Sequence, residues 1–158
     1  MKYIYDALDI LINISTESQK RVLLDKFISI SPLSFAKEFC TIKLGASRAS
    51  GHTYSVVRLM QERKMKIAYF SFSKITCKIF NNLVLFSNVK DNLKLNYNFR
   101  ENMDSLLGKT FDIDAIIVDN SFNLSNSQED MIYQFGAIYS NPRCRFSGSP
   151  YFYYIFLQ

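Results

Sequence analysis

Tryptophan is absent from this sequence, and histidine occurs once, at His52. The three cysteines, Cys40, Cys77 and Cys144, lie far apart and follow no metal-ligand spacing. The sequence therefore offers no zinc site and favours free thiols in a reducing compartment. It shows no signal peptide and no apolar run long enough to span a bilayer. We expect a cytoplasmic protein without a membrane partner, in the host cytoplasm if the source is viral.

What the chain does contain is typical of a globular domain. Apolar residues make up 48% of the 158 residues and charged residues 21%, a balance that suits one domain with a sizeable core. The formal net charge of +5 permits contact with nucleic acid without requiring it. Abundant Asn, Lys, Ile, Tyr and Phe resemble the AT-rich coding of many phages. We expect one domain over residues 1–158.

Helical spacing dominates the first 38 residues. We expect two amphipathic helices within Met1–Ile30, the second beginning at a capping box of Thr16 and Gln19. Ser31-Pro32 is a fresh helix start, with Pro at the first helical position. These helices are predicted to form an N-terminal extension, 1–38, to an α/β core, 39–158.

Short apolar runs alternate with helical patterns in the core. Strands are expected at Phe39–Leu44, Ile67–Phe72, Leu93–Phe99, Ile113–Val118, Arg143–Ser147 and Tyr151–Leu157. Helices are expected at Tyr54–Lys64, Lys74–Leu83, Glu101–Leu107 and Ser125–Tyr139, the last capped by Ser125 or Ser127. This alternation predicts an α/β fold with a mainly parallel sheet and helices on both faces. The Tyr-rich tail is either a buried strand or an exposed edge strand that binds a partner.

The segment from Thr41 to Thr53 is the most informative in the chain. A strand leads into a loop of small residues, and a helix follows the loop. This order directs several backbone N–H groups and a helix N-terminus at one point, which attracts phosphate. A Walker A loop reads G-x-x-x-x-G-K-[ST]. Gly51 and Thr53 match it, whereas His52 replaces the Lys and Ala46 the first Gly. The alternative is a plain strand–turn–helix corner. The candidate phosphate ligands are Ser47, Arg48, Ser50, Gly51, His52 and Thr53.

A literal Gly-Lys-Thr occurs at Gly108–Thr110. It lacks the earlier Gly, because Met103 stands there, and an apolar strand rather than a helix follows it. We interpret it as a chance tripeptide.

Asp114–Asn120 is an apolar strand that ends in an acid, which is the form of a Walker B motif. Asp119 would hold Mg²⁺ together with Thr53. The next position, where a catalytic Glu would orient water, carries Asn120, which cannot accept a proton. The alternative is a core strand that ends in an Asx turn.

Arg143–Pro150 is a strand followed by a turn of small residues ending in Pro. It resembles motif III of superfamily-2 helicases and the coupling motif of phage terminase large subunits. That resemblance implies γ-phosphate sensing by Ser147, Gly148 and Ser149. The alternative is an ordinary Ser-Gly-Ser-Pro turn.

Together the three motifs resemble the ATPase domain of phage terminase large subunits and superfamily-2 helicases. The resemblance covers Phe39 to Pro150 and implies a three-layer, RecA-like P-loop NTPase fold with ATP and Mg²⁺ as ligands. It predicts Leu44, Val118 and Phe146 near the carboxyl ends of neighbouring strands.

The altered motifs lower the expected activity. Because His52 and Asn120 stand where Lys and Glu act, we predict weak nucleotide binding or none, little hydrolysis, and a role exerted through a protein or nucleic-acid partner. One alternative is an active Mg²⁺-dependent ATPase, related to DNA-packaging or helicase motors, in which His52 replaces the Lys. Another is a nucleic-acid-binding module that uses basic residues such as Lys64, Lys66, Lys74 and Lys78.

Overall fold

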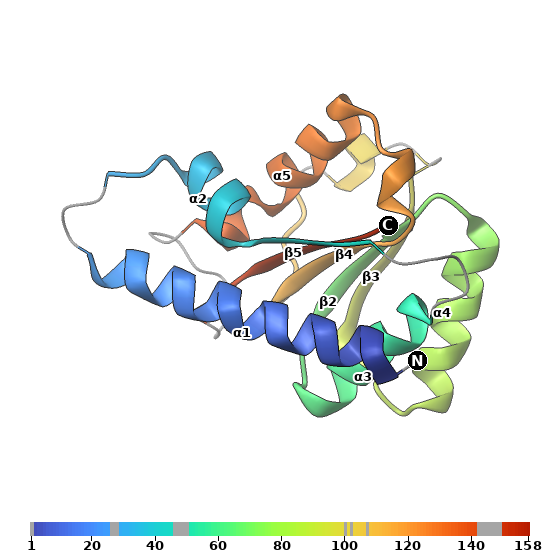
Figure 1. Ribbon diagram of the computed structural model, residues 1–158. Coiled ribbons are helices and arrows are strands. Elements are labelled where there is room, and N and C mark those ends of the chain that lie inside the picture. Colours follow the sequence, from blue (N-terminus) through green and yellow to red (C-terminus); the bar gives the residue numbers. More distant parts are fainter. Residues whose placement is uncertain are drawn as a thin grey trace.

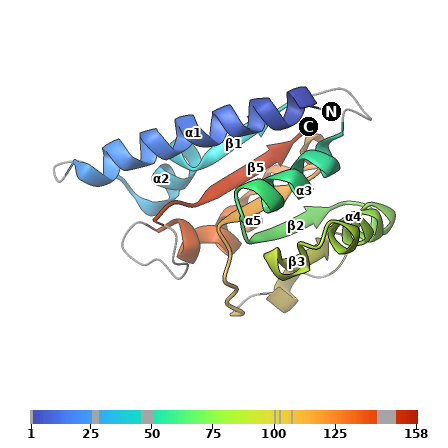
Figure 2. The same ribbon diagram turned by 90° about the horizontal axis from the view of Figure 1, so that it is seen from below.

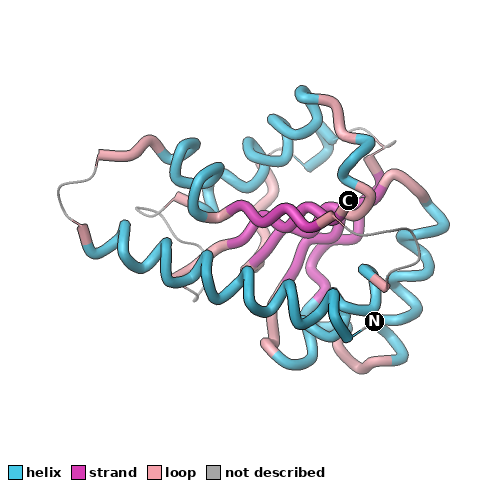
Figure 3. The backbone as a smooth tube through the Cα atoms, in the orientation of Figure 1, coloured by secondary structure: helices cyan, strands magenta, loops and turns pink. Residues whose placement is uncertain are grey.

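A five-stranded sheet with only parallel pairings lies at the centre of the computed structural model, which describes residues 2–25, 29–45, 51–99, 101, 103–106, 108–141 and 150–158. The strand order is β1-β5-β4-β2-β3. The strands are β1 (Thr41–Leu44), β2 (Ile67–Ser71), β3 (Leu93–Asn98), β4 (Ala115–Val118) and β5 (Tyr153–Leu157). Figure 3 shows them enclosed between helices. The expected α/β fold with a parallel sheet is confirmed.

Helices cover both faces of the sheet (Figures 1 and 2). One face carries α1 (Lys2–Leu24), α3 (His52–Glu62) and α4 (Lys74–Phe86), and the other carries α2 (Pro32–Phe39) and α5 (Asn126–Ser140). Two buried apolar clusters fill the spaces between these layers. Strand β2 contributes to both clusters: Ile67 and Tyr69 join the first, and Ala68 and Phe70 join the second. Alternate side chains of a strand point to opposite faces, so a strand covered on both sides is apolar throughout.

Most of the Tyr-rich tail forms β5, a fully buried strand that lies second from the β1 edge of the sheet. It pairs with β1 on one side and β4 on the other, aligning Leu157 with Leu44 and Phe156 with Val118. The alternative of an exposed edge strand is wrong for this tail. Leu44 and Val118 do end their strands at one edge, but β5 lies between them, so they are not on neighbouring strands. Phe146 and the strand expected at Arg143–Ser147 fall outside the described residues.

Residues 2–24 depart from expectation, because they form one helix, α1, and not two. Thr16 does not cap a second helix; its hydroxyl donates to the Ile12 carbonyl within α1. Gln19 bonds both the carbonyl and the N–H of Phe152, at 2.9 and 3.3 Å. These tertiary contacts use the side chains that the sequence suggested for a capping box. Helix α1 is thereby part of the layered core, against β1 and β5.

The starts of α2, α4 and α5 agree with the sequence, whereas α3 begins at His52, two residues before the expected Tyr54. Ser31 caps α2, with Pro32 at its first position, and Ser125 caps α5 in a capping box with Gln128. The helix expected at Glu101–Leu107 is wrong in type, since a 3₁₀ turn occupies Met103–Leu106. Within the described residues, no helix is both long and apolar enough to cross a bilayer.

Candidate functional site at the carboxyl edge of the sheet

All five strands end at the same edge of the sheet because every pairing is parallel. Helix α3 follows β1 on one face, and α5 follows β4 on the opposite face. In open α/β sheets, ligands bind outside the carboxyl ends of the strands, where the connections leave toward opposite faces. The ends of β1 and β4 flank the end of β5 in this way, so this edge is the first place to look for a site.

Helix α3 begins at this edge without a side-chain cap. Its N-cap is Gly51 in the left-handed conformation, at φ 86° and ψ 26°, and no side chain of the described residues caps the helix. The helices α2, α4 and α5 are instead capped by Ser31, Ser73 and Ser125. The first N–H groups of a helix lack intrahelical partners and carry its positive dipole end. The start of α3 therefore presents uncapped backbone donors.

The structure brings Thr53 and Asp119 together, although they are 66 residues apart in sequence. Thr53, in the first turn of α3, directs its Oγ1 to Asp119 Oδ2 at 3.5 Å, the outer limit of a hydrogen bond. Asp119 directly follows β4 and continues its pairing, because its N–H donates to the Phe70 carbonyl at 2.9 Å. A hydroxyl and a carboxylate thus meet beside the uncapped end of α3.

The Asp119 carboxylate is almost completely buried, at 4% exposure, and accepts hydrogen bonds on both oxygens. The Tyr69 hydroxyl donates to Oδ2 at 2.5 Å, and the Asn120 N–H donates to Oδ1 at 2.9 Å. Burial, and then the negative charge of Asp119, raise the pKa of Tyr69 well above its ordinary value. The tyrosine accordingly keeps its proton and remains a donor at any physiological pH.

Two buried polar atoms on these segments have no hydrogen-bond partner in the part of the chain that the structure describes. They are Nε2 of His52, beside Thr53, and Oγ of Ser121, two residues after Asp119. Ser121 is only 6% exposed. Buried polar atoms are nearly always paired, so unpaired ones flag places where an unseen ligand or water would supply the partner.

The donor set suits Mg²⁺ better than a transition metal. Thr53 and Asp119 offer a hydroxyl and a carboxylate, and Mg²⁺ prefers oxygen ligands, keeping several waters and using substrate phosphates. No group of three or more His, Cys, Asp or Glu residues suited to a metal occurs among the described residues. A site completed by nucleotide phosphates is the kind that these residues fit.

The predicted site residues separate into three groups. Thr53 and Asp119 are in contact, with Gly51, His52 and Asn120 adjacent to them in sequence. Ser47, Arg48, Ser50, Ser147, Gly148 and Ser149 lie outside the described residues. Sequence reasoning missed Tyr69 and Ser121. Tyr69 looks like any core residue of an apolar strand, and only the pairing of β2 with β4 places its hydroxyl at Asp119.

The Gly108–Thr110 tripeptide lies before β4 in the chain, and no helix follows it. The described residues after it run through Phe111, Asp112 and Ile113 directly into the strand. This is the opposite of the strand–loop–helix order of a phosphate loop, as the sequence predicted.

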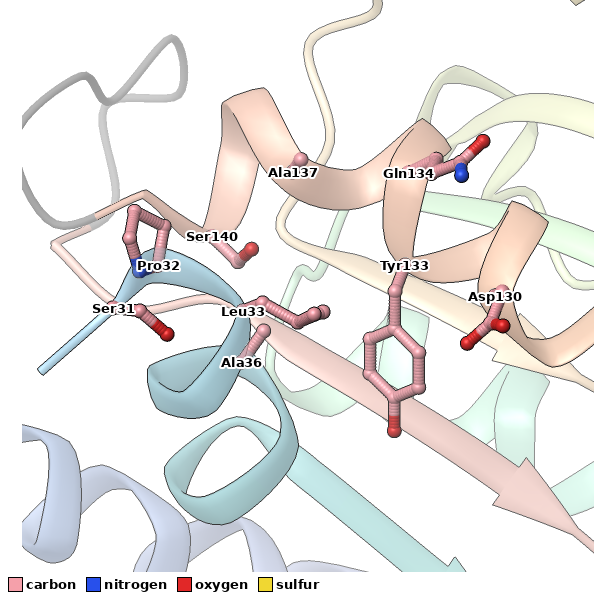
Figure 4. A pocket seen from close by; sticks show the side chains of 9 residues that line it. All are labelled: Ser31, Pro32, Leu33, Ala36, Asp130, Tyr133, Gln134, Ala137 and Ser140. Carbon is pink, nitrogen blue, oxygen red and sulfur yellow. The ribbon is translucent and has the colours of Figure 1, made fainter.

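A second candidate is a groove of about 520 Å³ between α2 and α5 (Figure 4). Its lining includes the exposed Leu33 of α2 and Tyr133 of α5. The polar groups beneath are already satisfied: the Tyr133 hydroxyl bonds Thr41, and the Ser140 hydroxyl bonds Tyr154. This groove gathers no reactive group, so it is a weaker candidate than the carboxyl edge.

No protein-family model matches the sequence, and no curated protein matches it. The residues and their geometry therefore carry the functional argument.

Proposed function

We propose that this protein is a P-loop-type nucleotide-binding protein with altered motifs. It holds Mg²⁺-nucleotide or phosphate weakly at the carboxyl edge of its sheet, hydrolyses it little, and works through a protein or nucleic-acid partner. The observation that carries the proposal is the contact between Thr53 and Asp119 beside the uncapped start of α3. These are the two positions at which a Walker A hydroxyl and a Walker B carboxylate would share Mg²⁺.

Weak binding is expected because backbone N–H groups and His52 can contact phosphate, whereas the lysine of a Walker A loop is missing. The backbone N–H groups at the start of α3 attract an anion without help from a side chain. His52 stands in place of a lysine, and its buried Nε2, which has no hydrogen-bond partner among the described residues, could bond a phosphate oxygen. A lysine would add a fixed positive charge on a longer side chain. We therefore expect a site that binds phosphate less tightly than a complete Walker A loop.

Slow hydrolysis follows from Asn120. Its backbone N–H is engaged with Asp119, and its amide side chain cannot take a proton from water. A purified sample should release phosphate from Mg²⁺-ATP at a rate near background. Robust turnover that disappears in Asp119→Ala would instead support the alternative of an active ATPase. The double variant His52→Lys with Asn120→Glu should bind nucleotide more tightly than the wild type.

Calorimetry with Mg²⁺-ATP tests the binding proposal, and the chain supplies a matched control. Gly51 and Gly108 both have left-handed backbones, at φ 86° and 79°. Replacing either by Ala strains the backbone by roughly 1–2 kcal/mol. Only Gly51→Ala adds a methyl group where phosphate would approach, so it should weaken binding while Gly108→Ala does not. Equal effects of the two variants, or no binding by the wild type, would refute a phosphate site here.

Salt dependence separates nucleotide from nucleic acid as the ligand. Among the basic residues considered for nucleic acid, Lys74 and Lys78 are exposed on α4, whereas Lys66 is paired with Asp112. Binding to nucleic acid should fall steeply as salt rises and should respond to Lys74→Ala and Lys78→Ala. It should not respond to Gly51→Ala. A fluorescently labelled oligonucleotide, titrated at several salt concentrations, distinguishes the two cases.

A further inference from the structure

The same carboxylate oxygen that faces Thr53 is also held by a tyrosine. Asp119 Oδ2 accepts the Tyr69 hydroxyl at 2.5 Å and the Thr53 hydroxyl at 3.5 Å. The other oxygen accepts the Asn120 N–H. The Tyr69 hydroxyl thus makes the strong hydrogen bond to Oδ2, whereas the Thr53 hydroxyl lies only at the limit of one. A cation shared by Thr53 and Asp119 would compete with the Tyr69 proton for this oxygen.

Tyr69 is held firmly in this position. Its side chain is completely buried, and its ring stacks on Phe80 of α4 with centroids 3.8 Å apart and planes 14° apart. Its strand, β2, is paired on both sides, with β4 and with β3. The hydroxyl therefore cannot swing into solvent, and losing its acceptor would leave it buried without a partner. The free-energy cost of leaving this buried hydroxyl unpaired is the main barrier to releasing Asp119 for a cation.

We propose that Tyr69 is a positioning residue that closes the candidate cation site by occupying Asp119, and that it sets how tightly the site binds a Mg²⁺-nucleotide. This inference rests on the proposed function, since it concerns the same site. It explains weak binding by a second cause, independent of the missing lysine. The tyrosine also keeps a buried carboxylate satisfied when no cation is bound, which stabilises the empty protein.

The substitution Tyr69→Phe tests the inference because it removes one hydroxyl and keeps the ring on Phe80. The control is Tyr154→Phe, which removes a buried hydroxyl bonded to Ser140 on the other face of the sheet. Calorimetry with ATP would be run with Mg²⁺ and with EDTA. We expect Tyr69→Phe to raise the affinity for Mg²⁺-ATP about tenfold, as for one hydrogen bond to a charged group. With EDTA the gain should vanish, and Tyr154→Phe should bind like the wild type.

A double-mutant cycle with Asp119→Asn provides a second readout. In the Asp119→Asn background, where only Mg²⁺-independent ATP binding remains, Tyr69→Phe should leave the affinity for ATP unchanged if it acts through the carboxylate. Equal or weaker binding by Tyr69→Phe, while the wild type does bind, would overturn the inference and leave the proposed function intact. A gain that persists with EDTA would also overturn it. Absence of binding by both the wild type and Tyr69→Phe would remove the proposed function and this inference with it.

Discussion

Strand β4 carries an aspartate at each end, and the two carboxylates are used differently. At the amino end, Asp114 is partly exposed and accepts the backbone N–H of Lys66 at 2.9 Å. At the carboxyl end, Asp119 is buried and accepts side-chain hydroxyls from β2 and α3. Asp114 joins neighbouring segments of backbone, which any good acceptor would do. Asp119 gathers hydroxyls from a strand and a helix that lie far from it in sequence.

The surroundings of the two ends reinforce the difference. At the amino edge, Arg63 is tied to α1 through the Asp9 carboxylate at 2.7 Å and Asn13 at 2.6 Å. Lys66 likewise pairs with Asp112. These two basic side chains are each paired with an acid. At the carboxyl edge, by contrast, polar atoms of His52 and Ser121 are buried without partners among the described residues. This contrast supports the proposal that a ligand binds at the carboxyl edge.

The largest expected effect is on stability. Replacing Asp119 with Ala leaves the buried Tyr69 hydroxyl without an acceptor, and should lower the free energy of unfolding by about 2–3 kcal/mol. Replacing Asp114 with Ala removes one bond from a partly exposed backbone N–H, and should lower it by about 1 kcal/mol. Urea unfolding followed by circular dichroism measures both. Equal losses of stability in the two variants, or an Asp119→Ala protein more stable than the wild type, would contradict the difference between Asp119 and Asp114.

Asn substitutions isolate charge from hydrogen bonding. Asp119→Asn keeps one oxygen as an acceptor but removes the negative charge that Mg²⁺ requires, so Mg²⁺-dependent ATP binding should be lost. Asp114→Asn, at the opposite edge, should bind like the wild type. Calorimetry with and without EDTA gives both affinities. A loss of binding in both variants would mean that the effect is structural and not local.

The pH dependence of stability should differ in the Asp114→Asn protein. Burial raises the pKa of Asp114 above the ordinary value of 3.8, with Asp112 adding to the shift and the Lys66 N–H and ammonium opposing it. The native state then binds the proton more tightly than the unfolded chain. Between 3.8 and the raised native pKa, this residue therefore makes the wild type more stable as pH falls. Asp114→Asn should lose that slope in urea unfolding across this window, and retention of the slope would assign it elsewhere.

The smallest effect is expected at Lys66. Its ammonium pairs with Asp112 at an exposed site, whereas its backbone N–H makes the bond to Asp114. Lys66→Ala keeps that backbone bond and removes only a surface ion pair, so its urea midpoint should stay close to that of the wild type. A loss as large as that of Asp114→Ala would show that the Lys66 side chain contributes as much as the backbone bond.

The sequence predicted the parallel sheet and the contact region because local rules decide both. Apolar runs alternating with helical spacing predict the layers, and polar residues directly after strands predict the edge where Thr53 and Asp119 meet. The order of the strands in the sheet could not be predicted from local sequence patterns. Nothing in Tyr153–Leu157 tells that it inserts between β1 and β4, because a buried central strand and an apolar edge strand share one composition.

Two misses have the same origin in tertiary contacts. Thr16 and Gln19 matched a capping box, but contacts with β5 and its preceding residue, Phe152, keep α1 continuous. The sequence did not indicate Tyr69 as a site residue, because its role depends on a hydrogen bond to Asp119, 50 residues away. Local patterns predict elements well, and long-range pairing decides which of their side chains meet.

The most direct test of a binding site at the carboxyl edge is a ¹⁵N–¹H NMR titration of the whole protein with Mg²⁺-ATP. The backbone amides of Gly51–Thr53, Asp119 and Asn120 should shift most, because phosphate would contact the start of α3 and the cation would perturb Asp119. The amide resonances of Lys66 and Asp114, at the amino edge, should not shift. Shifts that are absent, or that centre on the amino edge or on the α2–α5 groove, would contradict the account.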